Sequence, residues 1–387
     1  MPRRIVVMGG GPIGVAAAIG ALDRGFDVTL LEKDQPGQSL RSWGATRFFT
    51  PLAMNVSPRM LELLGSAAPP SDALLTGAEM ADRVLAPLVA SEPLRSRVRT
   101  HTRVVAIGRR GLTRFDYAGH PMRAERPFRL VVENGAGEEA IEADFVLDAT
   151  GGLVVPNRIG AGGLPARGEV NLQTRAIRTL GELDRRRGDL RGKRILLVGD
   201  GHSAANAIAL LADIAEADPA TRVCWAVRTL NRRPCESIAG DPLPERQRVV
   251  DLANRLAEDP PAFLRVERKA TVEAFHETED GLEVSLSGGR KWTCDSVAAF
   301  TGFRPGNSIQ SELTVEISPV TEGAARLYRA VANVTDCLAV PRLSARDLES
   351  GEPGYWLVGS RSYGGVRTFL LQTGLAQVET ILDSIQP

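Results

Sequence analysis

The chain has 387 residues, which corresponds to two domains, or at most three, at the usual size of about 100–200 residues each. Apolar residues make up 43% and charged residues 24%, the balance of an ordinary globular protein. Basic and acidic residues number 47 each, so the net charge is zero and gives no electrostatic case for a nucleic-acid or anionic-membrane partner.

The N-terminal apolar run is expected to be a strand rather than a secretory signal, because the glycines from residue 9 interrupt it. Residues 4–8 precede the turn GGGPIG at 9–14, and an Ala-rich helix follows to about residue 23. In such a turn the first glycine permits the bend, the second lets a pyrophosphate approach the backbone, and the third lets the helix pack closely. The sequence therefore predicts a dinucleotide site here.

The residue that ends the next strand indicates which dinucleotide binds. Residues 27–31 form this strand, and Glu32 follows it. A carboxylate at this position accepts hydrogen bonds from ribose hydroxyls and repels a 2′-phosphate. FAD and NAD suit the first turn, whereas NADP does not.

The middle of the first half reads as helices followed by a meander. Residues 60–95 are expected to be helical, with Met60 and Leu64 among the core positions. A hairpin over 128–133 and 138–143 leads into the sequence DATG at 148–151. Residues 151–168 are rich in Gly and Pro and are typical of a crossing between domains.

The second half repeats this order. Residues 194–198, the turn GDGHSA at 199–204, a helix to about 216 and a strand at 221–227 again form a strand, turn, helix and strand. Aligning the two second strands puts Arg228 where Glu32 sits, with Arg232 and Arg233 nearby, and a guanidinium there would pair with the 2′-phosphate of NADPH. A solvated basic loop is the alternative. His202 in the turn is expected to touch the pyrophosphate or to bond locally, not to act in catalysis.

The repetition continues to the end of the chain. A second hairpin over 271–276 and 282–286 leads into residues 295–302, and 303–306 form the return crossing. Residues 354–384 are expected to fold back onto the first module. The predicted fold is α/β, with two three-layer Rossmann-like domains and the NADPH domain inserted into the FAD domain. The expected segments are 1–160 (FAD), 161–305 (NADPH) and 306–387 (FAD).

The cysteines predict no relay and no metal site. Cys224, Cys235, Cys294 and Cys337 include no CxxC pair and no Cys/His cluster with ligand spacing. A reducing cytoplasm fits this usage, and a dithiol between flavin and substrate does not. No stretch approaches about 18 uninterrupted apolar residues, so no membrane span is expected.

The chain resembles the two-dinucleotide flavoprotein superfamily, which holds flavin-containing monooxygenases and thioredoxin-reductase-like enzymes. The similarity rests on residues 9–14 with Glu32, DATG at 148–151, residues 199–204, and FTGFRP at 300–305. A subgroup of bacterial monooxygenase-like flavoproteins is similar in RSWG at 41–44, VGSRSYG at 358–364 and FLLQTG at 369–374.

This resemblance implies that residues 41–56 and the C-terminal segment line the flavin. It also implies that a helix starting near Thr368 points its N-terminus at the isoalloxazine. Departures from the pattern are Ser360, where many relatives carry Asp, and Ala45, where the subgroup often has His. The FxGxxxHxxx(W/Y) fingerprint of monooxygenases and the disulfide-reductase CxxC are both missing.

Site residues follow from these motifs. The expected cofactor contacts are Gly9, Gly11, Pro12, Ile13, Gly14, Glu32, Lys33, Arg41, Trp43, Thr150, Gly151, Gly199, Gly201, His202, Ser203, Ala204, Arg228, Arg232, Gly302, Gly359, Ser360, Thr368 and Phe369. The candidates beside the reacting atoms are Trp43, Arg47, Asn55 and Tyr363, with core packing as the alternative for the aromatic residues. Arg361 and Arg367 are candidates for contact with phosphate or an acidic substrate, and a surface role is equally open.

Three functions remain open at this point. In the first, NADPH reduces FAD, and the reduced flavin reacts with O2 to oxygenate a small molecule at nitrogen or sulfur, or to hydroxylate it. In the second, flavin reduces a quinone or a small disulfide. In the third, the chain is a non-catalytic FAD/NADPH sensor. A small-molecule substrate, a cytoplasmic location and a homodimer are compatible with all three.

Overall fold

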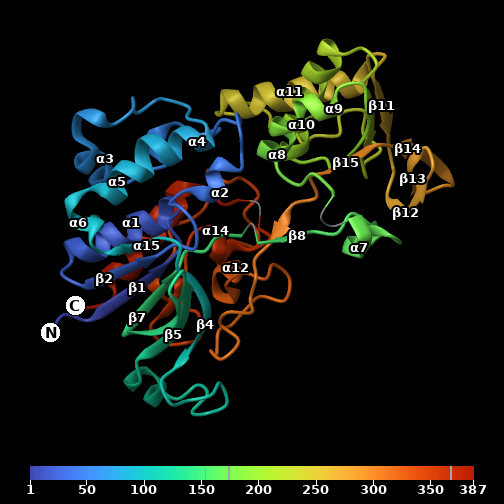
Figure 1. Cartoon of the computed structure of the whole chain (residues 1–387). Helices are drawn as coiled ribbons and strands as arrows, with labels where there is room; N and C mark the ends of the chain where they lie inside the picture. Colours follow the sequence, from blue (N-terminus) through green and yellow to red (C-terminus); the bar gives the residue numbers. More distant parts are fainter. Residues whose placement is uncertain (153, 173–174, 367) are drawn as a thin grey trace.

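The computed structural model describes the chain except residues 153, 173–174 and 367. It has two modules, each built on its own parallel sheet (Figure 1). The first module contains both ends of the chain, and the second is inserted between β7 and β17. The expected α/β fold with one Rossmann-like unit inserted into another is confirmed, whereas the proposed boundaries at 160 and 305 stay predictions.

The first module has a five-stranded sheet in the order β17-β7-β1-β2-β3. Its central strand β1 pairs in parallel with β2 and β7, so that Met8 lies opposite both Leu31 and Asp148. All these strands end at the same edge, next to the first glycine turn, where α/β proteins bind ligands. The strands are β1 (Arg4–Met8), β2 (Asp27–Leu31), β3 (Val98–Arg99), β7 (Phe145–Asp148) and β17 (Tyr355–Leu357).

The second module repeats this plan with four parallel strands in the order β11-β10-β9-β15. Its central strand β9 places Val198 opposite Ala226 and Ala299. Parallel strands covered on both faces are apolar throughout, as the run Ile195–Val198 illustrates. The strands are β9 (Arg194–Val198), β10 (Arg222–Ala226), β11 (Leu264–Glu267) and β15 (Ser296–Ala299).

A three-stranded antiparallel meander accompanies each parallel sheet, which confirms both expected hairpins. The first comprises β4 (Arg103–Arg109), β5 (Phe128–Asn134) and β6 (Gly137–Ala143). The second comprises β12 (Val272–Thr278), β13 (Gly281–Leu286) and β14 (Arg290–Cys294). The outgoing and return crossings pair as β8 (Val155–Pro156) and β16 (Phe303–Arg304).

The helices that follow the two glycine turns differ in burial. Helix α1 (Pro12–Asp23) is buried from Pro12 to Ala21, because it lies between its sheet and α15. Helix α10 (His202–Ala217) is amphipathic and buries one face only. The other helices are α2 (Gln38–Arg41), α3 (Pro58–Leu64), α4 (Gly77–Met80), α5 (Ala86–Ala90), α6 (Glu92–Arg95), α7 (Glu169–Leu172), α8 (Leu180–Arg185), α9 (Arg187–Leu190), α11 (Pro244–Glu258), α12 (Ala325–Val331), α13 (Ala345–Leu348), α14 (Ser360–Tyr363) and α15 (Leu371–Asp383).

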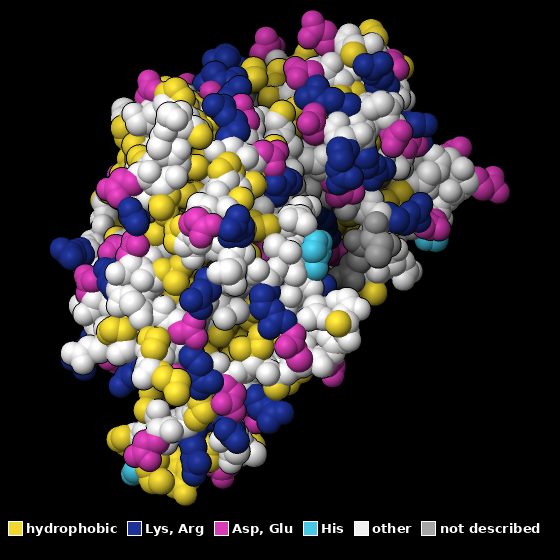
Figure 2. Space-filling view, turned by 60° about the vertical axis from the view of Figure 1, so that its left-hand side comes forward, with side chains coloured by type: hydrophobic (Ala, Val, Ile, Leu, Met, Phe, Trp, Pro, Cys, Tyr) yellow, Lys and Arg dark blue, Asp and Glu magenta, His cyan; other side chains and the backbone are white. Residues whose placement is uncertain are grey.

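Residues 60–95 contain several short helices, and Met60 and Leu64 are buried as expected. One expectation about helices needs correction. Helix α15 begins at Leu371 and not near Thr368, because Leu370 is extended and the Thr373 hydroxyl bonds to the Leu370 backbone. Within the described residues, no helix has the length and apolar character needed to cross a membrane. Figure 2 shows basic and acidic side chains interspersed over one face of the molecule.

Candidate functional site

The two glycine turns have the same backbone path. Gly9 and Gly199 have φ angles of +102° and +127°, a region that strongly favours glycine. Gly11 and Gly201 both precede a helix in extended conformation, with φ of −79° and −88° and ψ of −178° in each. The turns are therefore two copies of one structural element.

Side-chain space explains the glycines at the first and second positions. A Cβ on Gly9 would lie 2.6 Å from the Ala149 carbonyl oxygen, and one on Gly199 would lie 2.5 Å from that of Phe300. In contrast, a Cβ on Gly11 or Gly201 meets no atom of the described residues within 4 Å. The second glycine thus leaves open space beside a helix N-terminus, where a pyrophosphate fits.

The third position differs between the copies. A Cβ on Gly14 would lie 1.8 Å from the Gly9 carbonyl oxygen, so only glycine fits there. The second turn carries the buried Ala204, whose Cβ lies 3.6 Å from the Cβ position of Gly199. Helix α1 therefore approaches its strand more closely than α10 does.

Glu32 holds the first turn from the end of β2. The Gly10 backbone N–H donates to Oε2 at 2.6 Å, and the Asp34 N–H donates to Oε1 at 2.9 Å. A carboxylate oxygen has two lone pairs, so each oxygen can still accept from a ribose hydroxyl. Lys33 is exposed, with Nζ 3.8 Å from the Asp34 carboxylate, and does not join the turn.

Asp148 supports the neighbouring motif at the end of β7. Its Oδ1 accepts from the Thr150 backbone N–H at 3.0 Å and from the Thr150 hydroxyl, and its Oδ2 accepts from the Tyr355 hydroxyl at 2.8 Å. Arg361 donates Nε to the same Oδ2 at 3.1 Å, and both side chains of this ion pair are fully buried. Thr150 is thereby fixed at the edge of the sheet, with Gly151 next to it.

The C-terminal motif meets the first turn through Ile13. A Cβ on Gly359 would lie 3.0 Å from Ile13 Cγ1, and one on Gly374 would lie 2.7 Å from its Cδ1. Gly359 also has a φ of +65°. Ser360 begins helix α14. Its Oγ lies 3.8 Å from the position that a Cβ on Gly151 would take. The motifs at 9–14, 148–151 and 359–374 therefore lie together in the first module.

Residues 41–56 form a loop that we call the strap. Trp43 packs against Phe48 with ring centroids 4.9 Å apart and planes at 42°, and Arg41 donates to the Pro36 carbonyl at 2.7 Å. Arg47 is half-exposed and donates to the Leu74 carbonyl. Asn55 is buried, and its amide bonds both the hydroxyl and the carbonyl of Thr50, so it supports the strap, and its contact with a substrate stays a prediction.

Three of the C-terminal candidates, Tyr363, Thr368 and Arg361, are buried. Tyr363 is buried, packs on Phe369 at 5.2 Å between ring centroids, and burial raises its pKa. Thr368 is also buried. Arg361 is internal, since its Nη2 donates to Asn307 and Gln310 in addition to the Asp148 contact. The candidate Arg367 lies outside the described residues.

The expected alignment of Arg228 with Glu32 is wrong by one residue. Because Met8 pairs with Leu31 and Val198 pairs with Ala226, the counterpart of Glu32 is the buried Val227. Arg228 is one residue further, exposed, and reaches back over the turn to within 3.5 Å of Asp200 Oδ1. It still lies beside the second turn, where the adenosine ribose of a dinucleotide belongs.

The other predicted residues of the second module fall into two groups. Gly201, His202 and Ser203 are exposed at the start of α10, and the Trp225 indole fixes the turn by donating to the Gly199 carbonyl at 2.8 Å. Arg232 instead bonds the Glu258 carbonyl at the end of α11. Gly302 belongs to the return crossing between the modules. A Cβ on Gly302 would lie 3.3 Å from Asn157 Nδ2.

Sequence reasoning missed the Asp148–Arg361 pair and the position of Asp200. A lone carboxylate at the end of an apolar strand is the signal for Asp148, because a buried charge requires a partner. The partner is distant in sequence and could not be named without the fold.

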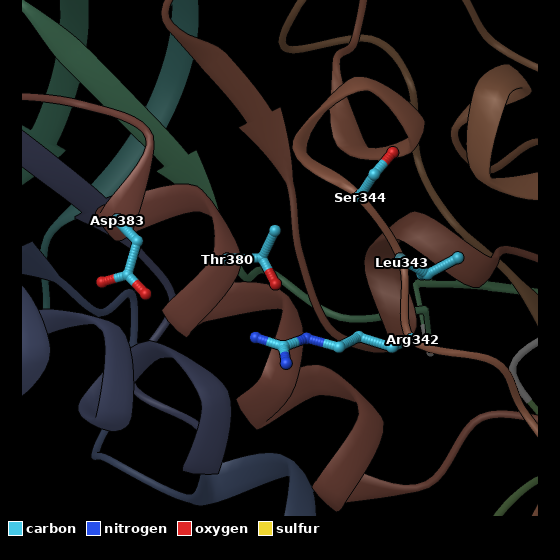
Figure 3. Close-up of a pocket in the computed structure, with 5 residues that line it drawn as sticks. All are labelled: Arg342, Leu343, Ser344, Thr380 and Asp383. Atoms are coloured by element: carbon cyan, nitrogen blue, oxygen red, sulfur yellow. The ribbon is translucent and has the colours of Figure 1, made fainter.

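Two surface cavities lie elsewhere. One of about 380 Å³ lies between residues 342–344 and helix α15, as Figure 3 shows for Arg342, Thr380 and Asp383. The other, of about 520 Å³, is lined by α1, α3 and α15. Neither is lined by residues 9–11 or 199–204, where the backbone donors and the open glycine positions are, so we assign the candidate site to the two turns.

The described residues hold no metal cluster, and all four cysteines are free. Burial raises the pKa of the Cys224, Cys235 and Cys294 thiols to about 12, so these thiols stay protonated at neutral pH.

Residues 6–105 match the family described as pyridine nucleotide-disulphide oxidoreductase. Among solved structures, the bacillithiol disulfide reductase of Bacillus cereus has a TM-score of 0.70 at 16% identity, covering 99% of this chain and 98% of that one. The Kutzneria ornithine N-hydroxylase has a TM-score of 0.67 at 16% identity, covering 99% of both chains. The T. acidophilum thioredoxin reductase has a TM-score of 0.60 at 15% identity, again covering 99% of both.

No curated protein matches this sequence. The structural similarities nevertheless extend over the whole chain and include both modules. The chain therefore shares its fold with these two-domain oxidoreductases. This fold occurs in disulfide reductases and in monooxygenases, so it does not by itself select the reaction.

Proposed function

We propose that this protein is an oxidoreductase that holds FAD in the first module and oxidises NADPH held in the second. One observation carries the proposal. Two glycine turns follow the same backbone path, yet an acid borders the first and an exposed arginine borders the second. Two different dinucleotides explain a duplicated cradle with opposite charges better than two copies of one ligand do.

The residues of the first module fit FAD. The open side of Gly11 and the N-terminus of α1 receive the pyrophosphate, and Glu32 accepts from the adenosine ribose. Thr150, which Asp148 fixes, and Ser360, which lies beside Gly151, would face the flavin. Bound FAD would supply the hydride acceptor, and the chain supplies position and electrostatics.

The residues of the second module fit NADPH. The backbone around Gly201 receives the pyrophosphate, with the exposed His202 and Ser203 at the helix start. Arg228 is free to leave Asp200 for a 2′-phosphate, because their contact of 3.5 Å is long and the arginine side chain is 71% exposed.

For the reaction we propose oxygenation of a small molecule by O2. Solved structures that share the fold include ornithine and cadaverine monooxygenases, and the absence of a cysteine pair in this sequence disfavours the dithiol relay of a disulfide reductase. Trp43, which packs against the buried Phe48 in the strap, would supply an apolar wall that excludes water. Direct reduction of a quinone or a small disulfide is the second candidate, favoured by the similarity to bacillithiol disulfide reductase. A sensor that binds both nucleotides without turnover is the third.

The test begins with purified protein loaded with FAD, which should be yellow and should consume NADPH in air. Peroxide is then measured with and without amines, thioethers, quinones and small disulfides. An oxygenase should make less peroxide per NADPH when its substrate is present, because oxygen goes into product. NADPH consumption that persists without O2 and depends on a quinone or disulfide would identify the reductase. Failure to bind FAD would refute the proposal, and binding of both nucleotides without consumption would leave the sensor.

A further inference from the structure

One aromatic contact joins the two proposed cofactor sites. The rings of Phe49 and His202 meet edge to face, with centroids 5.4 Å apart and planes at 79°. Phe49 belongs to the strap of the first module, and His202 is the first residue of α10 in the second. A first-module side chain therefore lies against the second turn.

The strap backbone explains why Phe49 points there. Around Arg47 and Phe48 the chain is extended, since Arg47 bridges to Thr76 and the Phe48 N–H donates to the Leu75 carbonyl at 2.8 Å. Successive side chains of an extended chain point in opposite directions. Phe48 packs into the core of the first module, whereas Phe49 packs against the core of the second.

A backbone contact holds the strap in this place. The Gly181 N–H in α8 donates to the Ser42 carbonyl at 2.9 Å. A Cβ on Gly181 would lie 2.5 Å from the Ser42 oxygen, and one on Gly44 would lie 2.8 Å from the Gly181 Cα. The strap therefore fits tightly against the second module before it reaches Phe49.

We propose that Phe49 controls access of the nicotinamide half of NADPH to the flavin. This inference rests on the proposed function. The open side of Gly201 and the exposed Arg228 receive the pyrophosphate and the adenosine half without disturbing Phe49. The nicotinamide half would extend from the pyrophosphate toward the first module, because its hydride would go to the flavin there. It would meet Phe49 on His202, and this ring would have to move aside.

Some contacts exist only in the protein without ligand and must break when the ligand binds. Such a contact weakens ligand binding by the free energy with which it stabilises the unliganded protein. An aromatic pair of this kind corresponds to about a two- to tenfold change in an equilibrium constant. Removing the ring should therefore strengthen NADP⁺ binding by about two- to tenfold. The affinity for a ligand without nicotinamide should not change.

The experiment uses the FAD-loaded protein and two probes, NADP⁺ and 2′,5′-ADP, titrated by calorimetry. In Phe49→Ala we expect tighter NADP⁺ binding and unchanged 2′,5′-ADP binding. Phe49→Leu keeps apolar bulk without the ring and should lie between the wild type and Phe49→Ala. Phe115→Ala removes a ring that is 84% exposed, outside both turns, and serves as the matched control. FAD content should be equal in all variants.

Unchanged or weaker NADP⁺ binding in Phe49→Ala would overturn the inference. Equal strengthening of both probes would also overturn it, because the ring would then obstruct the whole turn. If the wild type and Phe49→Ala bind neither probe, the assignment of NADPH to the second module fails. That result differs from a failure of Phe49 alone, in which both proteins bind both probes alike.

Discussion

The first and second glycine turns share a backbone but differ in what surrounds it. In the first, Glu32 and Asp148 end the two strands that flank β1. In the second, the corresponding residues are Val227 and Ala299, both buried and apolar. At the surface of the second turn, Asp200 and Arg228 form an ion pair.

This difference separates two tasks of a dinucleotide site. Backbone N–H groups and an open glycine are enough to hold a pyrophosphate, which every dinucleotide has. The choice of ligand depends on the side chains beside the turn. The first turn has internal charges that fix its shape, whereas the second has an exposed charge that can move to a ligand.

Among these substitutions, Asp148→Asn is expected to lower the stability of the protein most. The change leaves Arg361 buried without its ionic partner, so we expect a loss of about 3–5 kcal/mol in the free energy of unfolding. Denaturant unfolding of the protein measures it. Tyr355→Phe is the control, since it removes one hydrogen bond to the same carboxylate and should cost about 1 kcal/mol. A smaller loss in Asp148→Asn than in Tyr355→Phe would show that the ion pair does not stabilise the site.

Gly14→Ala and Ala204→Gly exchange the third positions of the two turns. The methyl group at residue 14 would overlap the Gly9 carbonyl, so we expect a loss of about 1–3 kcal/mol in stability together with loss of bound FAD. Ala204→Gly only lowers helix propensity and should cost about 1 kcal/mol at most. Thermal unfolding and the ratio of flavin to protein measure both. Normal FAD content in Gly14→Ala would contradict the close approach of α1.

Arg228→Glu tests the charge beside the second turn. Replacing a guanidinium that pairs with a 2′-phosphate should weaken NADPH binding by about 10- to 100-fold. NADH binding should change much less, because NADH lacks that phosphate. Titration of both nucleotides gives the two dissociation constants. Equal losses for NADPH and NADH would remove Arg228 from the 2′-phosphate site.

Local patterns were sufficient to predict most of the fold. Each glycine turn lies between an apolar run and a helix, and each hairpin has its own turn residues, so neighbours in sequence determine these elements. The position of Arg228 was misplaced because a one-residue shift at a strand end depends on pairing with β9, which the sequence does not contain. The sequence also did not show that Asn55 bonds to Thr50 inside the strap, because this contact depends on the loop conformation.

By itself, the sequence determined that two glycine turns, each between a strand and a helix, follow one another, because each of these units is made of consecutive residues. Only the tertiary structure decided which distant residues meet: Asp148 with Arg361, and Phe49 with His202. These contacts depend on how sheets, helices and modules pack, and packing brings together residues that no local pattern relates.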